Sequence, residues 1–192
     1  SVVEDRANQF ILGGAISTQS GFVGNLGVTF GNLGGRGQSF SIDSNLGQNS
    51  QFINMSFNEP WLFGRDISAS ASVFIDQNRN PRNPYNSQLF GGGVSLGYRL
   101  SENVTQDWNY ELSRSNIDNV SDDAPFIIAQ DAGIAWLSIV GQDITFDSRD
   151  NVQAPREGWV WRLSNDLAGL GGQVSYLKNI ASVRHYIPVR DE

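Results

Sequence analysis

The chain has 192 residues, of which 39% are hydrophobic and 17% are charged, and its formal net charge is −7. This composition is too polar for a bundle of membrane helices and too poor in charge for an ordinary soluble surface. No basic patch stands out, which argues against nucleic acid as a partner, and the absence of cysteine excludes disulfides and thiolate metal sites.

Alternation of apolar and polar residues predicts about ten strands, whereas no stretch shows the 3.6-residue period of a helix. In chain order the predicted strands are 9–19, 22–31, 38–47, 53–58, 67–75, 88–101, 104–114, 134–146, 159–167 and 173–189. We therefore expect very low helix content.

Two of these segments carry extra information. In 88–101, Phe90, Val94 and Leu96 share one parity, while the other parity holds glycine, serine and arginine. In 134–146 the apolar parity shifts part of the way along, which predicts a β-bulge near Gly141.

The predicted connections differ in length. Residues 62–66 and 100–103 form short turns, whereas 76–86 and 118–131 are long, polar and contain proline. Short turns at one end and long loops at the other are typical of membrane β-barrels. A soluble β-sandwich produces a similar rhythm, so that alternative stays open.

Reactive side chains do not form a catalytic pattern. His185 is the only histidine, and we interpret it as a packed strand residue because apolar residues follow it. The pair Asp122 and Asp123 is expected to be solvated in a loop, and no Gly-Lys-Ser/Thr phosphate loop occurs. We expect no enzyme activity, no cofactor and no metal site.

Seven short strings occur in a characteristic order. They are 17–22 (STQSGF), 32–38 (NLGGRGQ), 57–61 (FNEPW), 62–66 (LFGRD), 145–151 (TFDSRDN), 155–158 (PREG) and 167–172 (LAGLGG). Together they resemble the barrel domain of the Omp85 superfamily, also called the bacterial surface antigen family. The motif positions are Gly35, Arg36, Gly37, Gln38, Glu59, Pro60, Gly64, Arg65, Asp66, Asp147, Arg149 and Asp150. Turn chemistry alone is the alternative role for each of them.

The resemblance implies an all-β, antiparallel transmembrane β-barrel of about sixteen strands, preceded by periplasmic POTRA repeats. Residues 1–8 would end the periplasmic linker, and residues 9–192 would form about ten strands of a partial barrel domain. The family's Val-Arg-Gly-Phe/Tyr motif and its aromatic-terminated closing strand do not occur in this sequence. We therefore expect a fragment or a short relative, located in the outer membrane of a Gram-negative bacterium or of a derived organelle.

The function implied by the resemblance is outer-membrane protein assembly, with the first strand acting as a lateral gate that templates client strands. The gate residues would be Gln9, Ile11, Gly13, Gly14 and Ile16. Glycine weakens a strand by roughly 0.5–1 kcal/mol relative to alanine, as a gate that opens requires. The alternative is that Gly13 and Gly14 relieve crowding or bend the strand.

Expected partners are the lipid bilayer, unfolded outer-membrane protein clients and accessory assembly lipoproteins. A missing barrel half or another copy of the chain would satisfy open strand edges, which are costly in lipid. Three alternative functions stay open: a passive channel or structural barrel, a two-partner secretion transporter of the same superfamily, and an exported soluble binding module.

Overall fold

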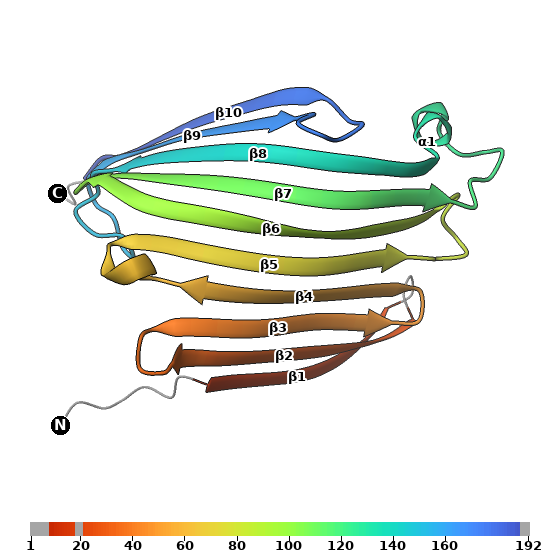
Figure 1. Ribbon diagram of the computed structural model, residues 1–192, viewed down its shortest axis with the longest axis horizontal. Helices are drawn as coiled ribbons and strands as arrows, with labels where there is room; N and C mark the ends of the chain where they lie inside the picture. Colours follow the sequence, from red (N-terminus) through yellow and green to blue (C-terminus); the bar gives the residue numbers. More distant parts are fainter. Residues whose placement is uncertain (1–7, 18–20, 189–192) are drawn as a thin grey trace.

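The computed structural model describes residues 8–17 and 21–188, which form one antiparallel sheet of ten strands in sequence order (Figure 1). The strands are β1 (Asn8–Ser17), β2 (Gly21–Leu33), β3 (Gln38–Gly47), β4 (Ser50–Glu59), β5 (Ile67–Asn78), β6 (Asn86–Ser101), β7 (Val104–Asp118), β8 (Gly133–Asp147), β9 (Gly158–Ala168) and β10 (Tyr176–Tyr186). Each corresponds to a predicted strand, so the all-β antiparallel fold is confirmed. Residues 1–7, 18–20 and 189–192 lie outside the described part. They include most of the expected linker and part of the 17–22 string.

Strand register divides the side chains between two faces. Leu96 pairs with Ala69 on β5 and Trp108 on β7, whereas its neighbour Ser95 pairs with Ser70 and Asn109. Directly paired residues share a face, so we name these the apolar face and the polar face. Further members of the apolar face are Phe10, Leu12, Leu26, Val28, Phe40, Ile42, Met55, Phe57, Val73, Val94, Leu112, Val140, Ile144, Trp161, Leu163 and Leu177.

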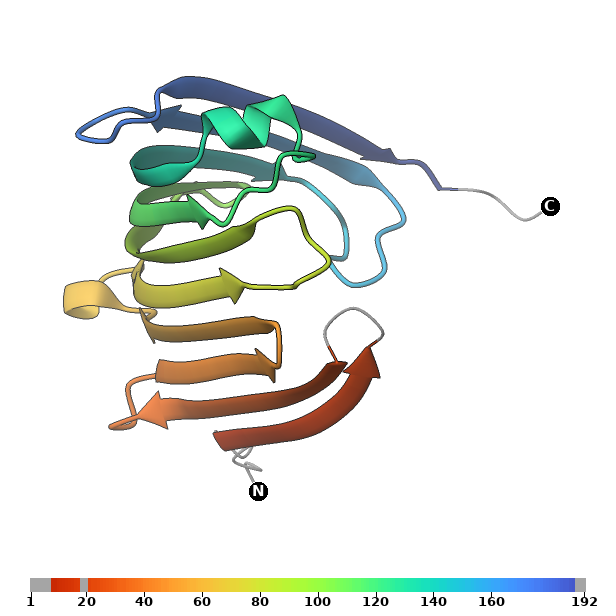
Figure 2. The same ribbon diagram turned by 90° about the vertical axis from the view of Figure 1, so that its right-hand side faces the viewer.

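The sheet is curved like a trough, with β1 and β10 along its two rims (Figure 2). Glycines on the polar face lie in crowded surroundings: a Cβ on Gly91 would meet the Ser113 Cβ at 2.6 Å, and one on Gly97 would collide with the Asp107 carboxylate. A membrane barrel turns its apolar face to lipid and its polar face to the interior, so we assign the polar face to the inside of the trough. Within the described residues each rim strand pairs with one neighbour, which makes this a partial barrel.

The single-layer sheet leaves its large apolar side chains uncovered. Among the described residues, Val160 and Ala168 are the buried apolar side chains, while Leu96 is 46% exposed. Exposed apolar area on this scale marks a surface that contacts another apolar phase. The helices are a 3₁₀ turn, η1 (Leu62–Gly64), and α1 (Phe126–Gln130). Neither of them is long and apolar enough to cross a membrane.

Two sequence predictions need correction. The predicted bulge near Gly141 is absent, because β8 pairs without interruption with β7 and β9 through this position. A Cβ on Gly141 would collide with the Asn109 side chain, so the glycine makes room for a neighbour. The expected separation of short and long connections also fails, because residues 148–157 form a long connection at the end that otherwise holds short turns.

Candidate functional site

The outer edge of β1 is the first candidate site. β1 pairs with β2 from Asn8↔Phe30 to Ser17↔Gly21, and its other edge has no partner strand in the described part of the chain. The side chains of Phe10, Leu12 and Ile16 are 67%, 74% and 88% exposed. The N–H and C=O groups of this edge are therefore available to pair with another strand.

All five predicted gate residues lie in β1. Gln9, Ile11 and Gly13 fall on the polar face, whereas Gly14 and Ile16 fall on the apolar face. A Cβ on Gly13 would come no closer than 3.8 Å to its neighbours, and one on Gly14 no closer than 3.6 Å. These are ordinary contact distances, so packing does not require glycine at either position.

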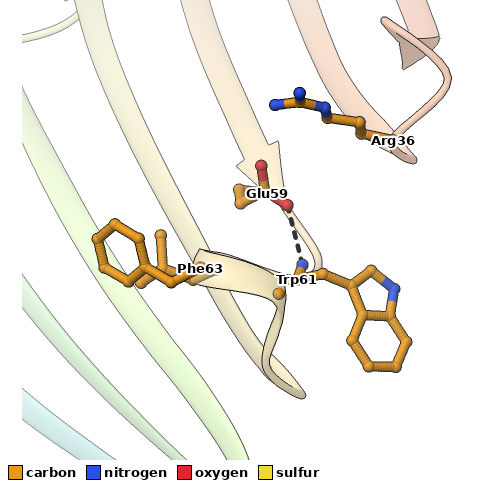
Figure 3. Close-up of a pocket in the computed structure, with 6 residues that line it drawn as sticks. Arg36, Glu59, Trp61 and Phe63 are labelled. Atoms are coloured by element: carbon orange, nitrogen blue, oxygen red, sulfur yellow. Dashed lines mark hydrogen bonds between the residues drawn. The ribbon is translucent and has the colours of Figure 1, made fainter.

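The turns before β3 and after β4 meet at the end of the sheet where β1 begins. The Gln38 amide donates to the Glu59 carboxylate at 2.5 Å. The backbone N–H of Trp61 donates to the other Glu59 oxygen at 2.9 Å (Figure 3). A Cβ on Gly37 would lie 3.3 Å from Pro60. Four motif positions far apart in sequence are thereby brought together.

This turn pair borders a cleft of about 650 Å³ lined by Arg36, Glu59, Trp61, Leu62, Phe63 and Gly64. Trp61 and Phe63 point away from each other on either side of Glu59 (Figure 3) and are 55% and 91% exposed. Aromatic side chains at strand ends are typical of the membrane–water boundary.

The other motif positions of these turns act through the backbone. Gly35 and Gly64 have φ angles of 71° and 72°, which favour glycine. Their N–H groups donate to the carbonyls of Asn32 and Trp61, each at 3.0 Å. The N–H of Arg65 donates to the carbonyl of Leu62, and Asp66 follows immediately before β5.

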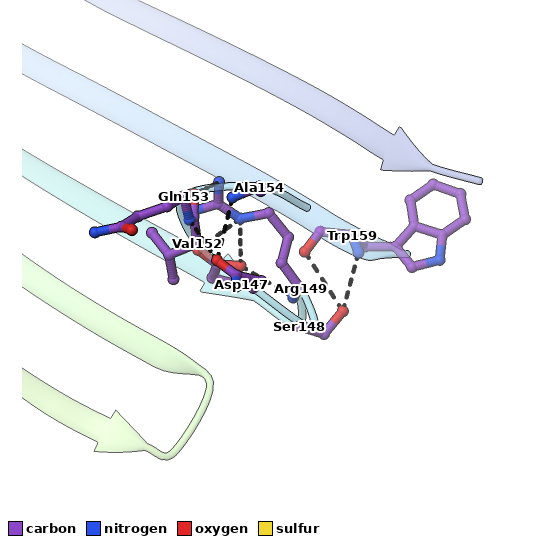
Figure 4. Close-up of polar contacts among 8 residues, drawn as sticks. Asp147, Ser148, Arg149, Val152, Gln153, Ala154 and Trp159 are labelled. Atoms are coloured by element: carbon purple, nitrogen blue, oxygen red, sulfur yellow. Dashed lines mark hydrogen bonds and ion pairs between the residues drawn. The ribbon is translucent and has the colours of Figure 1, made fainter. Parts of the chain in front are cut away.

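The connection between β8 and β9 forms a second ordered turn at the same end of the sheet. Arg149 donates to both carboxylate oxygens of Asp147, from Nε at 2.9 Å and from Nη2 at 2.5 Å, and its Nη1 donates to the Val152 carbonyl (Figure 4). The Arg149 guanidinium also lies 6.0 Å from the centre of the Tyr186 ring on β10. The pair thus links this turn to two strands.

Asp150 organises the rest of this turn. Its carboxylate accepts hydrogen bonds from the backbone N–H groups of Arg156 at 2.9 Å and Glu157 at 3.2 Å. These donors stabilise the charged form and lower the pKa of the Asp150 carboxyl below its usual value. Gly158 has a φ of 118° and lies against the backbone of Ser148, which leaves no space for a side chain.

A further ordered segment was not predicted. The β9–β10 connection folds against the free part of the β8 edge, where the N–H of Gly169 donates to the Ser138 carbonyl and that of Gln173 to the Trp136 carbonyl. The hydroxyl of Ser138, which is fully buried, donates to the Leu170 carbonyl at 2.6 Å. The glycine-rich 167–172 string was the only sequence signal for this connection.

His185 lies on the apolar face and stacks on Trp159, with ring centroids 3.7 Å apart and an interplanar angle of 9°. The prediction of a strand histidine is confirmed, although His185 is exposed on the apolar face and is not part of a packed core. Taken together, the candidate features in the described residues are the unpaired edge of β1 and the ordered turns at the end of the sheet where β1 begins.

An antiparallel sheet with one exposed apolar face and one polar face is the architecture of transmembrane β-barrel proteins. The model of the Omp85 superfamily domain matches residues 32–192, and the chain belongs to this superfamily. Its location is accordingly the outer membrane of a Gram-negative bacterium or of a derived organelle.

Individual relatives agree with this assignment. The chain is 30% identical over 185 residues to the outer membrane protein assembly factor BamA of Neorickettsia risticii, covering 94% of this chain and 25% of that protein. It is 30% identical over 119 residues to the chloroplastic outer envelope protein 80 of Arabidopsis thaliana, covering 56% of this chain and 16% of that protein.

A crystal structure of BamA from Haemophilus ducreyi lacking POTRA domains 1-3 has the same fold, with a TM-score of 0.73 at 18% sequence identity. That match covers 97% of this chain and 38% of the solved chain. The chain thus spans a quarter or less of the two curated relatives described above.

Proposed function

We propose that this chain is the first part of the barrel of an outer-membrane protein assembly factor, and that β1 is a lateral gate that templates client β-strands. The observation that carries the proposal is the open outer edge of β1, with its exposed side chains. The name of the Neorickettsia risticii relative, an outer membrane protein assembly factor, supports the same function.

The two rim strands differ in a way that favours β1 as the gate. β1 contains Gly13 and Gly14, neither of which is required by packing, so its backbone pays more entropy to stay extended. β10 contains no glycine, and its Lys178 forms an ion pair with Asp166 on β9 at 3.8 Å. β1 is therefore the rim strand suited to pair reversibly.

The physical basis is the cost of unpaired backbone in lipid. A client strand entering the bilayer must hydrogen bond along both edges, and the outer edge of β1 satisfies one of them by β-augmentation. Because side chains alternate along β1, a client strand paired with it would direct alternate residues toward lipid and toward the barrel interior.

The partners follow from the same geometry. Unfolded outer-membrane proteins are the clients, the bilayer contacts the apolar face, and the rest of the barrel or another copy closes the rims when no client is bound. Accessory assembly lipoproteins are proposed to act with the full-length protein. Residues 1–8 are proposed to join the barrel to a periplasmic part.

Cysteine cross-linking tests the gate directly, because the sequence contains no cysteine. In the full-length protein, Gln9→Cys on β1 should form a disulfide with a single cysteine in the terminal strand of a stalled client, since directly paired side chains lie about 4.5–5.5 Å apart. Ser39→Cys is the matched control, because β3 is paired on both sides. Equal cross-linking at the two positions would contradict the proposal.

A reconstitution experiment separates assembly from passive conduction. Vesicles containing the full-length protein should accelerate the folding of a denatured outer-membrane protein over empty vesicles. Ion conduction without such acceleration would instead identify the passive channel.

A further inference from the structure

Arg114 has an unusual position among the charged residues of the sheet. It lies on the apolar face of β7, paired with Phe90 on β6 and Trp136 on β8. The other strand cations of the described residues lie on the polar face. They are Arg99, Arg162, Lys178 and Arg184.

Arg114 has no anionic partner in the described part of the chain, where the salt bridges are Arg149–Asp147 and Lys178–Asp166. Asp118 lies two positions further along the same face of β7, beyond Asn116, but its oxygens accept hydrogen bonds from the amides of Asn86 and Asn116. An arginine facing lipid without a counter-ion is costly. An anionic group beside this face would lower that cost.

The depth of Arg114 indicates where that group lies. Toward the α1 end of the sheet, the next position on the apolar face of β7 is Asn116, which pairs with Gln88. Toward the middle of the strand, the next position is Leu112. Arg114 thus marks the boundary between the apolar band and the polar end, where a long side chain reaches the headgroup level.

A groove adjoins Arg114 on the apolar face. It has a volume of about 290 Å³ and is lined by Val73, Phe90, Gly91, Gly92, Leu112 and Trp136. Gly92 lines the groove at a position where no side chain fits, because a Cβ there would meet the Ser72 carbonyl at 2.9 Å and the Val73 side chain at 3.2 Å. The apolar lining begins beside the cation and continues toward the middle of the strands.

We propose that Arg114 and this groove form a binding site for an anionic phospholipid. The guanidinium binds the phosphate with paired N–H donors, and an acyl chain lies in the groove over Gly92. A phospholipid supplies both missing features, a negative charge at the boundary and a hydrocarbon chain below it. This inference goes beyond the proposed assembly function and does not depend on it.

Lipid retention tests the proposal. The full-length protein is folded into nanodiscs of phosphatidylcholine with a minor share of phosphatidylglycerol, and the lipids that remain bound are identified by native mass spectrometry. Wild type should retain phosphatidylglycerol above its share of the disc, and Arg114→Gln should lose that enrichment. Arg99→Gln, which removes a cation from the polar face, should leave it unchanged. Unchanged enrichment in Arg114→Gln would overturn the proposal.

A second measurement covers the case in which Arg114→Gln fails to fold. Trp136 lines the groove, so its fluorescence, obtained by subtracting the spectrum of Trp136→Phe, reports on the acyl chain there. Brominated phosphatidylglycerol should quench Trp136 more strongly than brominated phosphatidylcholine at the same share of the disc. Equal quenching by the two lipids would show general lipid contact only and would overturn the site.

Discussion

Asp150 illustrates how a single side chain orders a turn. Its ionised carboxylate accepts two backbone hydrogen bonds, and its pKa is lowered relative to the unfolded chain. Its stabilising effect is therefore fully present above the unfolded pKa of about 3.9 and is lost as the pH falls through the lower folded value.

The expected result is that the β8–β9 turn loosens between about pH 5 and pH 2 in wild type. Asp150→Asn should remove this pH dependence, because an amide oxygen accepts the same bonds without titrating. Hydrogen exchange at the N–H groups of Arg156 and Glu157, compared between the two proteins at each pH, measures the effect. An identical pH profile in both proteins would refute this role.

A comparison of Gly158 with Gly171 separates the energetic cost of backbone strain from the cost of a steric collision. Both have positive φ, at 118° and 93°, but only at Gly158 does a Cβ meet other atoms, namely the Ser148 and Arg149 backbone. Alanine at either site should cost about 1–3 kcal/mol from strain, and Gly158→Ala should cost more because of the added collision. Denaturant titration of the folded full-length protein in detergent measures both, and a larger loss for Gly171→Ala would contradict the geometry.

The sequence predicted many of the important residues but few of their contacts. Gln38 and Glu59 were recognised as turn positions, yet their hydrogen bond depends on the β3–β4 register, which residue patterns do not specify. Likewise, His185 was predicted to pack, but its stacking on Trp159 required knowing which strands adjoin.

At the level of elements, the most specific prediction concerns the glycines of β1. Alanine at Gly13 or Gly14 fits the available space and should favour the extended strand by about 0.5–1 kcal/mol. Because a gate strand that pairs more firmly opens less readily, each variant should slow client folding in the vesicle assay.

Gly24→Ala on β2 is the control for these variants. Gly24 pairs directly with Gly14 and also has room for a Cβ, with its nearest neighbour at 3.9 Å, but β2 is paired on both sides. This substitution should leave the assembly rate unchanged. An equal loss of rate in Gly24→Ala would indicate a general effect of sheet stiffness.

Strand periodicity predicted the elements well because each strand has two different environments. The regular alternation in β6 shows this directly, since Leu96 and Ser95 lie on opposite faces. The β9–β10 connection was missed because its contacts with β8 use backbone groups, which leave no periodic signal. The bulge near Gly141 was wrongly predicted because the apolar parity changes along β8 without any break in strand pairing.

At the scale of the whole molecule, the apolar face of the sheet requires lipid and the polar face requires water. Leu96→Arg places a charge on the apolar face and should destabilise the protein by roughly 2–4 kcal/mol at the midplane. Thr105→Glu, at an exposed position on the polar face of β7 directly opposite Arg99, should be close to neutral. Denaturant titrations in vesicles compare them, and equal effects would mean that the face assignment is wrong.

Membership of the Omp85 superfamily and the open rims of the sheet are both features of a partial barrel. In the described residues each rim strand has one partner strand, an arrangement that is costly in hydrocarbon, and we propose that further strands or another copy of the chain seal the rims. The same requirement connects fold with proposed function, because a rim that must be sealed is also one that can accept a client strand.

The most direct test is a spin-label scan of β6 in the full-length protein in vesicles, with single cysteines at positions 94, 95, 96 and 99. The face assignment predicts that labels at Val94 and Leu96 collide mainly with oxygen dissolved in lipid, whereas labels at Ser95 and Arg99 collide mainly with a water-soluble nickel complex. Uniform accessibility along the four positions, without a two-residue period, would contradict it.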